Sequence, residues 1–220
     1  IVIDNSSSMH YPVANKGKLL FSVLAAAALS YLLQKQRDAV GITAFSDKID
    51  KSTPIKSTST HLNKLFIELE HLLAEQTKLR STQVAPVLHE IADKNHKRSL
   101  IIIFSDMFDR QVELDEIFKS LQHLKHNNHE VLLFHVTDHQ TEYKFEFEDR
   151  PYEFIDLESG DKLKINPSQV TDMSTRKVGE YYNELKLRCG QLKIDLIEAD
   201  IREGFNNILK AYLIKRSRMK

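Results

Sequence analysis

Short apolar runs rich in β-branched residues alternate along this chain with longer stretches of helical periodicity. The apolar runs cover 1–3, 40–45, 100–104, 131–136 and 193–197. The helical patterns cover about 16–36, 59–74, 82–95, 111–126, 168–189 and 203–216. Strands without polar alternation are buried on both faces, and strands that alternate with helices usually form a parallel sheet. The sequence therefore predicts an α/β protein with a central, mostly parallel sheet and helices on both faces.

One segment interrupts this alternation. The runs YEFIDL and KLKIN alternate polar and apolar residues on either side of a turn that contains Gly160 and Asp161. Alternation around a glycine-containing turn is typical of a β-hairpin. We expect a hairpin inserted at about 140–166 of a single domain that spans 1–220, because a 41% hydrophobic content at this length can bury one substantial core.

Charge and glycine content exclude two kinds of binding. The 31 basic residues match the 31 acidic residues, so the chain lacks the excess of positive charge that nucleic acid binding requires. The six glycines, at 17, 41, 160, 179, 190 and 204, do not fall at the spacing of a phosphate-binding loop. We therefore expect neither nucleic acid nor a glycine-cradled nucleotide as a ligand.

The expected compartment is the cytoplasm. Cys189 is the single cysteine, which excludes an intrachain disulfide and a zinc site made of several thiolates. The apolar stretch 19–33 is shorter than the roughly 20 residues of a membrane-spanning helix, so a buried helix and no membrane insertion are predicted. The chain opens at Ile1 without a signal peptide, and we expect an N-terminal truncation that would hide any upstream anchor.

Charge is unevenly distributed. Residues 142–161 hold eight acids and two bases, whereas 202–220 hold six bases and one acid. Both segments are consistent with solvated surfaces, and either could meet a partner of opposite charge.

Small oxygen-bearing side chains follow two of the predicted strands. Asp4, Ser6 and Ser8 follow the first strand in a D-x-S-x-S pattern, and Asp106 follows the strand 100–104. Thr82 lies at the head of the helix that precedes this second strand. Ligands of open parallel sheets bind outside the carboxyl ends of the strands, so these five residues are expected at one edge.

This set of residue types favours a hard cation. Mg²⁺ takes six oxygen ligands and commonly retains waters. Ser6 and Ser8 can both face one ion because they are two residues apart on a loop, while Asp4 accepts hydrogen bonds beneath them. A site with few direct carboxylates leaves positive charge on the ion and an open position for a carboxylate of a partner. The alternative is that Asp4, Ser6 and Ser8 only cap a helix and form a polar turn.

These motifs resemble the metal-ion-dependent adhesion site of von Willebrand factor A domains. Asp4-x-Ser6-x-Ser8, Thr82 in LRSTQVAPVL and Asp106 in IIIFSDMFD carry the resemblance. LLFSVLAAAALSYLLQKQRDAVGITAFSD and FIDLESGDKLKINPSQV are similar to the bacterial family catalogued as domain of unknown function 58. The resemblance implies a Rossmann-like von Willebrand factor A fold in which Ser6, Ser8 and Thr82 ligate Mg²⁺ or Mn²⁺ by their hydroxyls. It implies that Asp4 and Asp106 act largely through water.

The resemblance also implies a function. Members of this family usually accompany MoxR-type AAA+ ATPases, so the chain is expected to be a protein-binding adaptor or co-chaperone and not an enzyme. Two departures from the pattern, Ser7 in place of a common glycine and Gln83 in place of a common acid, remove no ligand.

Two rival functions use the same residues. A metal-dependent phosphoester hydrolase would place an aspartate after the first strand, but it normally has a second carboxylate where this chain has Ser6. It would also have a lysine beside Asp106, and Arg110 is the nearest base in the sequence. The other rival is a scaffold that binds no metal. The histidines at 123, 126, 129, 135 and 139 are not expected to converge on one ion.

Overall fold

A six-stranded sheet forms the centre of the computed structural model, which describes residues 1–13, 17–74, 83–95, 98–107, 114–157 and 160–218. The strands lie in the order β3-β2-β1-β4-β5-β8. Their bounds are β1 Val2–Asp4, β2 Thr43–Phe45, β3 Ile49–Ser52, β4 Leu100–Ser105, β5 Glu130–Thr137 and β8 Asp195–Asp200. β3 pairs antiparallel with β2, and all other pairs are parallel. The predicted α/β class with a mostly parallel, Rossmann-like sheet is confirmed.

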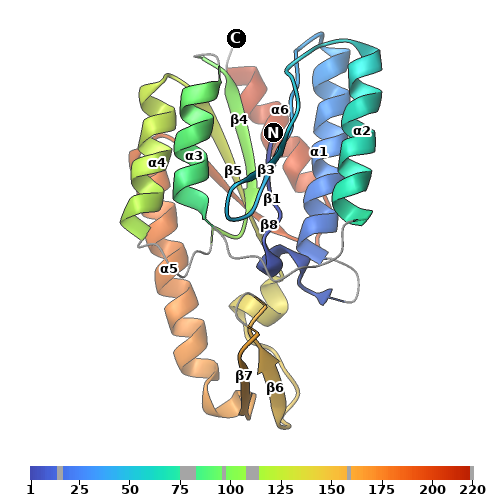
Figure 1. The fold of residues 1–220 in the computed structure, drawn as a ribbon. Coiled ribbons are helices and arrows are strands. Elements are labelled where there is room, and N and C mark those ends of the chain that lie inside the picture. The colour runs from blue at the N-terminus through green and yellow to red at the C-terminus, as the bar shows by residue number, and fades with distance from the viewer. Residues whose placement is uncertain (14–16, 75–82, 96–97, 108–113, 158–159, 219–220) are drawn as a thin grey trace.

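Helices cover both faces of this sheet (Figure 1). One layer contains α1 Gly17–Lys35, α2 Ser59–Ala74 and α6 Asn206–Arg218. The opposite layer contains α3 Val84–Lys94, α4 Leu114–His126 and α5 Thr171–Gln191. A hydrophobic core lies on each face of the sheet, and alternate residues of β1 point into one or the other. Ile3 packs with α1 and α2, whereas Val2 packs with α3 and α4.

The helix α1 is long and apolar enough to cross a membrane by length and composition, and 61% of its most apolar window is buried inside the protein. It packs against α2, α6 and the sheet, which agrees with the buried helix predicted for 19–33. A close approach fixes its start, since a Cβ on Gly17 would lie 2.3 Å from Pro12 Cδ. The backbone N–H of Lys18 donates to Tyr11 O at 3.0 Å. This bond holds the first turn of α1 at the edge of the sheet where the parallel strands have their carboxyl ends, the lower edge in Figure 1.

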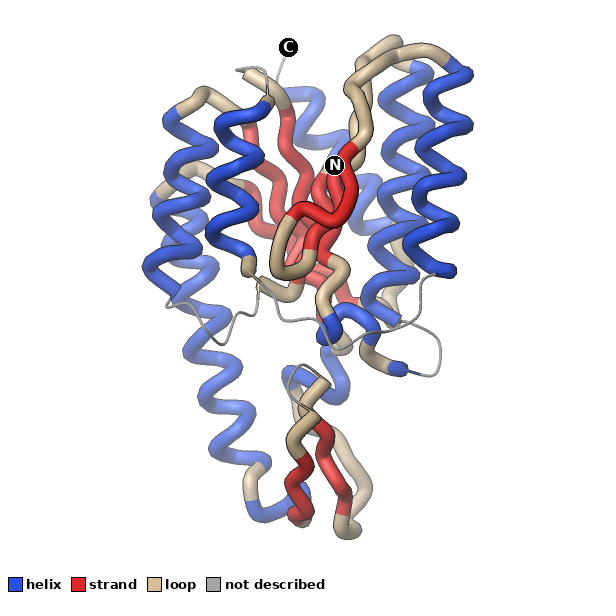
Figure 2. The backbone as a smooth tube through the Cα atoms, viewed as in Figure 1, coloured by secondary structure: helices blue, strands red, loops and turns tan. Residues whose placement is uncertain are grey.

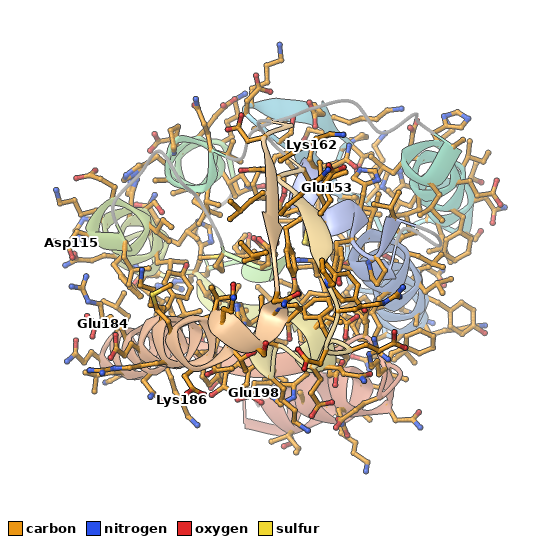
Figure 3. All side chains as sticks on the ribbon, turned by 90° about the horizontal axis from the view of Figure 1, so that it is seen from below. Asp115, Glu153, Lys162, Glu184, Lys186 and Glu198 are labelled. Carbon is orange, nitrogen blue, oxygen red and sulfur yellow. The ribbon has the colours of Figure 1, made fainter. Side chains whose placement is uncertain are left out.

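The predicted hairpin is present and projects beyond this edge (Figure 2). Its strands, β6 Tyr152–Ile155 and β7 Lys162–Ile165, pair antiparallel. Register pairing puts Glu153 opposite Lys164, and Lys162 donates to Glu153 at 3.1 Å. Figure 3 shows Glu153 and Lys162 side by side on the hairpin. Phe145 and Phe147 pack on Phe154 at ring-centroid distances of 5.7 and 5.3 Å. A lone two-stranded hairpin is marginally stable, so this aromatic cluster supplies its apolar contact.

Two predicted strands differ in the structure. The predicted strand 40–45 is shorter, because Val40 forms only an isolated bridge with Lys56 and regular pairing begins at Thr43. The predicted strand 193–197 begins later, at Asp195, since Lys193 has a φ of 54° and ends the preceding helical segment. The antiparallel edge strand β3 was not predicted, because IDKS is mostly polar and exposed.

Candidate metal centre

The candidate site lies where the strand order of the sheet reverses. From β1 the chain continues to β2 on one side, while β4 pairs on the other side, so β1 and β4 flank a topological switch point. Asp4 ends β1 and Asp106 follows β4 directly. Ligand sites of doubly wound sheets form in the crevice at such a point, outside the carboxyl ends of the strands. The structure therefore places the two predicted carboxylates at the edge where a ligand would bind.

Asp4 is fully buried and held by two donors. The backbone N–H of Ser6 donates to its Oδ1 at 2.9 Å, and the hydroxyl of Ser105 donates to its Oδ2 at 2.6 Å. Burial and the negative charge of Asp106 raise the pKa of Asp4 to about 7, against the opposing effect of these hydrogen bonds. A nearby cation would favour the charged form of this carboxylate.

Ser6 and Ser8 present their hydroxyls to each other. Their Oγ atoms lie 3.1 Å apart, at the start of a short 3-10 helix formed by Ser7–His10. Adjacent ligands of an octahedral ion with bonds of about 2.1 Å are separated by about 3 Å. This pair of hydroxyls therefore has the spacing of two neighbouring ligands of Mg²⁺. Ser6 makes no side-chain cap to the 3-10 helix, whereas Asp4 accepts the backbone N–H of Ser6, as in a polar turn.

Asp106 forms a buried ion pair with the side chain of Lys18. Lys18 Nζ lies 2.9 Å from Asp106 Oδ2 and 2.6 Å from Glu142 Oε1. Burial opposes the charge of Lys18, but the two carboxylates outweigh it and raise the pKa of Lys18 above its usual range. The expectation that no lysine lies beside Asp106 is wrong, because Lys18 is remote in sequence but adjacent in space.

Thr82 lies outside the described residues. The next residue, Gln83, is described, and its backbone N–H donates to Ser46 O at 3.0 Å. Ser46 directly follows β2, the neighbour of β1. The described chain that leads into α3 is therefore attached to the same edge of the sheet as Asp4.

Four residues at this edge were given no role by the sequence pattern. The Ser105 hydroxyl donates to Asp4, and Lys18 donates to both Asp106 and Glu142. Asn5 Oδ1 is buried and has no hydrogen-bond partner among the described residues, so this oxygen is available as a ligand. Ser105 could have been found from the sequence, because it directly precedes Asp106 at the end of a predicted strand. Lys18 and Glu142 carry no such signal, because their contacts depend on tertiary structure.

The oxygen set suits a hard cation. Hydroxyls at ligand spacing, two carboxylates and an unpartnered amide oxygen are the ligand types of Mg²⁺ and Mn²⁺. Within the part of the chain that the structure describes, no group of three or more His, Cys, Asp and Glu is arranged to hold a metal. A site for this ion would accordingly depend on the hydroxyls of Ser6 and Ser8.

Reactive side chains outside the predicted set are Cys189 and His135. Burial raises the pKa of the Cys189 thiol to about 12, so this cysteine is unreactive at neutral pH. His135 Nε2 lies 3.0 Å from the carbonyl oxygen of Asp106, and burial lowers the pKa of its ring.

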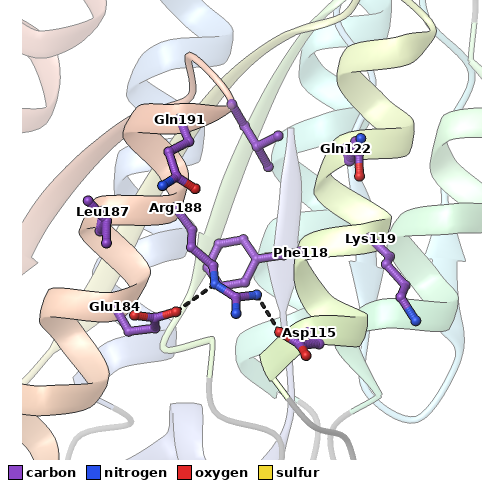
Figure 4. A pocket seen from close by; sticks show the side chains of 9 residues that line it. Asp115, Phe118, Lys119, Gln122, Glu184, Leu187, Arg188 and Gln191 are labelled. Carbon is purple, nitrogen blue, oxygen red and sulfur yellow. Dashed lines mark hydrogen bonds and ion pairs between the residues drawn. The ribbon is translucent and has the colours of Figure 1, made fainter.

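A groove of about 540 Å³ lies between α4 and α5, and Arg188 forms ion pairs there with Asp115 and Glu184 (Figure 4). None of the candidate metal residues lines it.

Comparison with known families and structures agrees with this topology. The family model described as "Protein of unknown function DUF58" matches residues 1–181. The chain belongs to the DUF58 family. None of the curated protein sequences compared with this DUF58 chain matches it.

Two solved structures resemble this DUF58 chain in fold. The conserved hypothetical protein BatB from Bacteroides thetaiotaomicron has a TM-score of 0.58 and 14% identity, over 99% of this chain and 96% of that one. An aerotolerance-related membrane protein from Bacteroides fragilis has a TM-score of 0.55 and 12% identity, over 90% of this chain and 89% of that one. At these identities the likeness concerns the fold alone.

Proposed function

We propose that this chain is a von Willebrand factor A-like domain that binds Mg²⁺ or Mn²⁺ and uses the ion to bind another protein. Asp4, Ser6, Ser8, Thr82 and Asp106 form the proposed metal-ion-dependent adhesion site. The observation that carries the proposal is the Ser6–Ser8 hydroxyl pair, 3.1 Å apart beside two buried carboxylates at the switch point of the sheet.

The ligand types suggest how such a site binds a partner. When bound, a divalent cation held mainly by neutral hydroxyls keeps positive charge and accepts a carboxylate from outside. Lys18 neutralises part of the charge of Asp106, which further reduces the negative charge that the protein offers to the ion. The partner then contributes an Asp or Glu, and the loops around the site select among partners.

The partner class rests on the resemblance to domains that accompany MoxR-type AAA+ ATPases. We propose an ATPase of this type as the partner and an adaptor or co-chaperone role, without catalysis by this chain. The cytoplasm is the proposed compartment. The aerotolerance in the description of one structural neighbour is said of that protein, and a shared fold carries no function by itself.

Thermal unfolding with and without metal tests the proposal. Ligands that bind the folded state raise its melting temperature, so millimolar Mg²⁺ or Mn²⁺ should stabilise the wild type relative to a chelator. The double variant Ser6→Ala/Ser8→Ala should lose this response, whereas Ser7→Ala, in the same loop, should keep it. An equal response of the double variant and the wild type would refute the metal site. Absence of any response in the wild type would favour a scaffold that binds no metal.

Phosphoester hydrolysis at the same site is a second candidate, and Lys18 is the observation that favours it. A lysine beside an aspartate at the end of a strand can neutralise a phosphoryl group. Purified protein with Mg²⁺ and a panel of phosphate esters separates the two functions. Turnover that disappears in Asp4→Ala would favour the enzyme, and no turnover would favour protein binding.

A further inference from the structure

Two histidines face each other on the far side of the protein from α1. His89 lies on α3 and His123 on α4, and their Nδ1 atoms are 3.0 Å apart. The ring centroids are 5.2 Å apart and the rings are inclined by 45°. No local pattern associates them, because 34 residues separate them in the chain.

A carboxylate orients one of the two rings. Asp93 lies one helical turn after His89 on α3, and its Oδ1 is 3.3 Å from His123 Nε2. With its proton on Nε2, His123 faces this carboxylate and leaves the Nδ1 lone pair directed toward His89. Histidines that bind metals commonly donate their second ring N–H to a carboxylate in this way.

The two Nδ1 atoms share a hydrogen bond at 3.0 Å, and a metal ion bound between them would replace its proton. Zinc–imidazole bonds are about 2.0 to 2.1 Å long, so two ligands in a tetrahedral arrangement lie about 3.3 Å apart. A separation of 3.0 Å needs only a small ring movement to reach this value. The side chain of His123 is 30% exposed and that of Asp93 is 69% exposed, so solvent can reach the pair.

We propose that His89 and His123 form a binding site for a divalent transition metal of the Zn²⁺ class, with Asp93 as the residue that orients His123. Imidazole nitrogen suits Zn²⁺, Ni²⁺ and Cu²⁺, whereas Mg²⁺ prefers oxygen. Among the described residues no third His, Cys, Asp or Glu completes the set, so waters or an outside ligand would fill the remaining positions of the ion. This site is independent of the proposed function, and it joins α3 to α4.

Calorimetric titration of the purified chain with Zn²⁺ tests the proposal. We expect one site per chain, weaker than a zinc site with four protein ligands because this chain supplies two, and His89→Ala and His123→Ala should each weaken Zn²⁺ binding at least tenfold. Asp93→Asn should weaken it by roughly tenfold, because loss of an orienting carboxylate typically costs that much in metal affinity. His126→Ala removes an exposed histidine of the same helix and should leave the affinity unchanged.

Two further measurements show whether Zn²⁺ binds at these histidines instead of at Ser6 and Ser8, and whether a loss of binding is only a loss of folding. Ser6→Ala/Ser8→Ala should bind Zn²⁺ as the wild type does, and excess Mg²⁺ should not displace the ion. The far-ultraviolet circular dichroism of each variant reports its folding, and His89→Gln and His123→Gln replace any alanine variant that fails to fold. The proposal is overturned if the wild type binds no Zn²⁺, or if folded His89 and His123 variants bind it with wild-type affinity.

Discussion

Lys18 Nζ lies 2.9 Å from Asp106 Oδ2, although 88 residues separate the two in the sequence. The side chains are only 1% and 7% exposed. The same ammonium group binds Glu142, which belongs to the five-residue helix His139–Tyr143 that precedes the hairpin. Lys18 therefore links the strand end that carries a candidate metal residue to the base of the inserted segment.

Replacing Lys18 tests this link. Lys18→Met leaves two carboxylates without their cation, and removal of one partner of a buried ion pair typically costs several kcal/mol. We expect a loss of about 3 kcal/mol in the free energy of unfolding, measured with urea in a chelator. Mg²⁺ should restore more stability to Lys18→Met than to the wild type, because a cation near Asp106 then replaces the missing charge.

Lys35→Met is the matched control for this prediction. Lys35 lies on the same helix but is exposed, and its contact is with the ring of Tyr31. Its loss should change stability by less than about 1 kcal/mol. Equal effects of the two substitutions would show that Lys18 contributes only as a helix residue.

Asp4 should make the stability of the metal-free protein depend on pH. Its pKa is raised from 3.8 to about 7 in the folded state, so between these values the folded state holds a proton that the unfolded state has released. This contribution to stability is present at low pH and is lost as the pH rises through about 7. In a chelator, Asp4→Asn should therefore be more stable than the wild type at pH 8, because asparagine places no buried charge at this position.

Denaturant unfolding at a series of pH values measures this difference. The gain of Asp4→Asn should shrink toward pH 4, and the exposed control Asp47→Asn should show no such trend. Mg²⁺ should stabilise the wild type more at pH 8 than at pH 6, because the ion and the proton compete for the same carboxylate. A gain for Asp4→Asn that does not change with pH would contradict the role of a buried charge.

The parts of this structure that sequence reasoning predicted are those encoded by local pattern. β4 and β5 are recognisable because burial on both faces leaves an unbroken apolar run. β8 was misplaced because an edge strand with the sequence DLIEAD carries charges that a buried strand lacks. Asp4 and Asp106 were found by their position after strands, whereas Lys18 at the start of an apolar helix has no local feature that points to Asp106.

A buried carboxylate at the end of β5 gives a second prediction on pH. The side chain of Asp138 is 1% exposed, and Arg202 donates to both of its oxygens, from Nε to Oδ1 at 2.6 Å and from Nη2 to Oδ2 at 2.9 Å. Burial alone would raise the pKa of Asp138, but the hydrogen bonds and charge of Arg202 outweigh it and hold this pKa below its usual range. A depressed pKa contributes stability above the unfolded value of 3.8, and this stability is lost as the pH falls through the folded value.

Arg202→Ala should therefore destabilise the protein at pH 7 by about 2 kcal/mol, because a buried carboxylate loses its charged donors while Arg202 itself is half exposed. The deficit relative to the wild type should narrow as the pH falls toward 4, since Asp138 of the variant then protonates and no longer buries a charge. Arg150→Ala is the control, because Arg150 and its partner Glu148 are both largely exposed and such pairs contribute little. Urea unfolding of the three proteins between pH 4 and pH 7 measures the effect, and a deficit that stays constant over this range would mean that Arg202 acts through packing instead of charge.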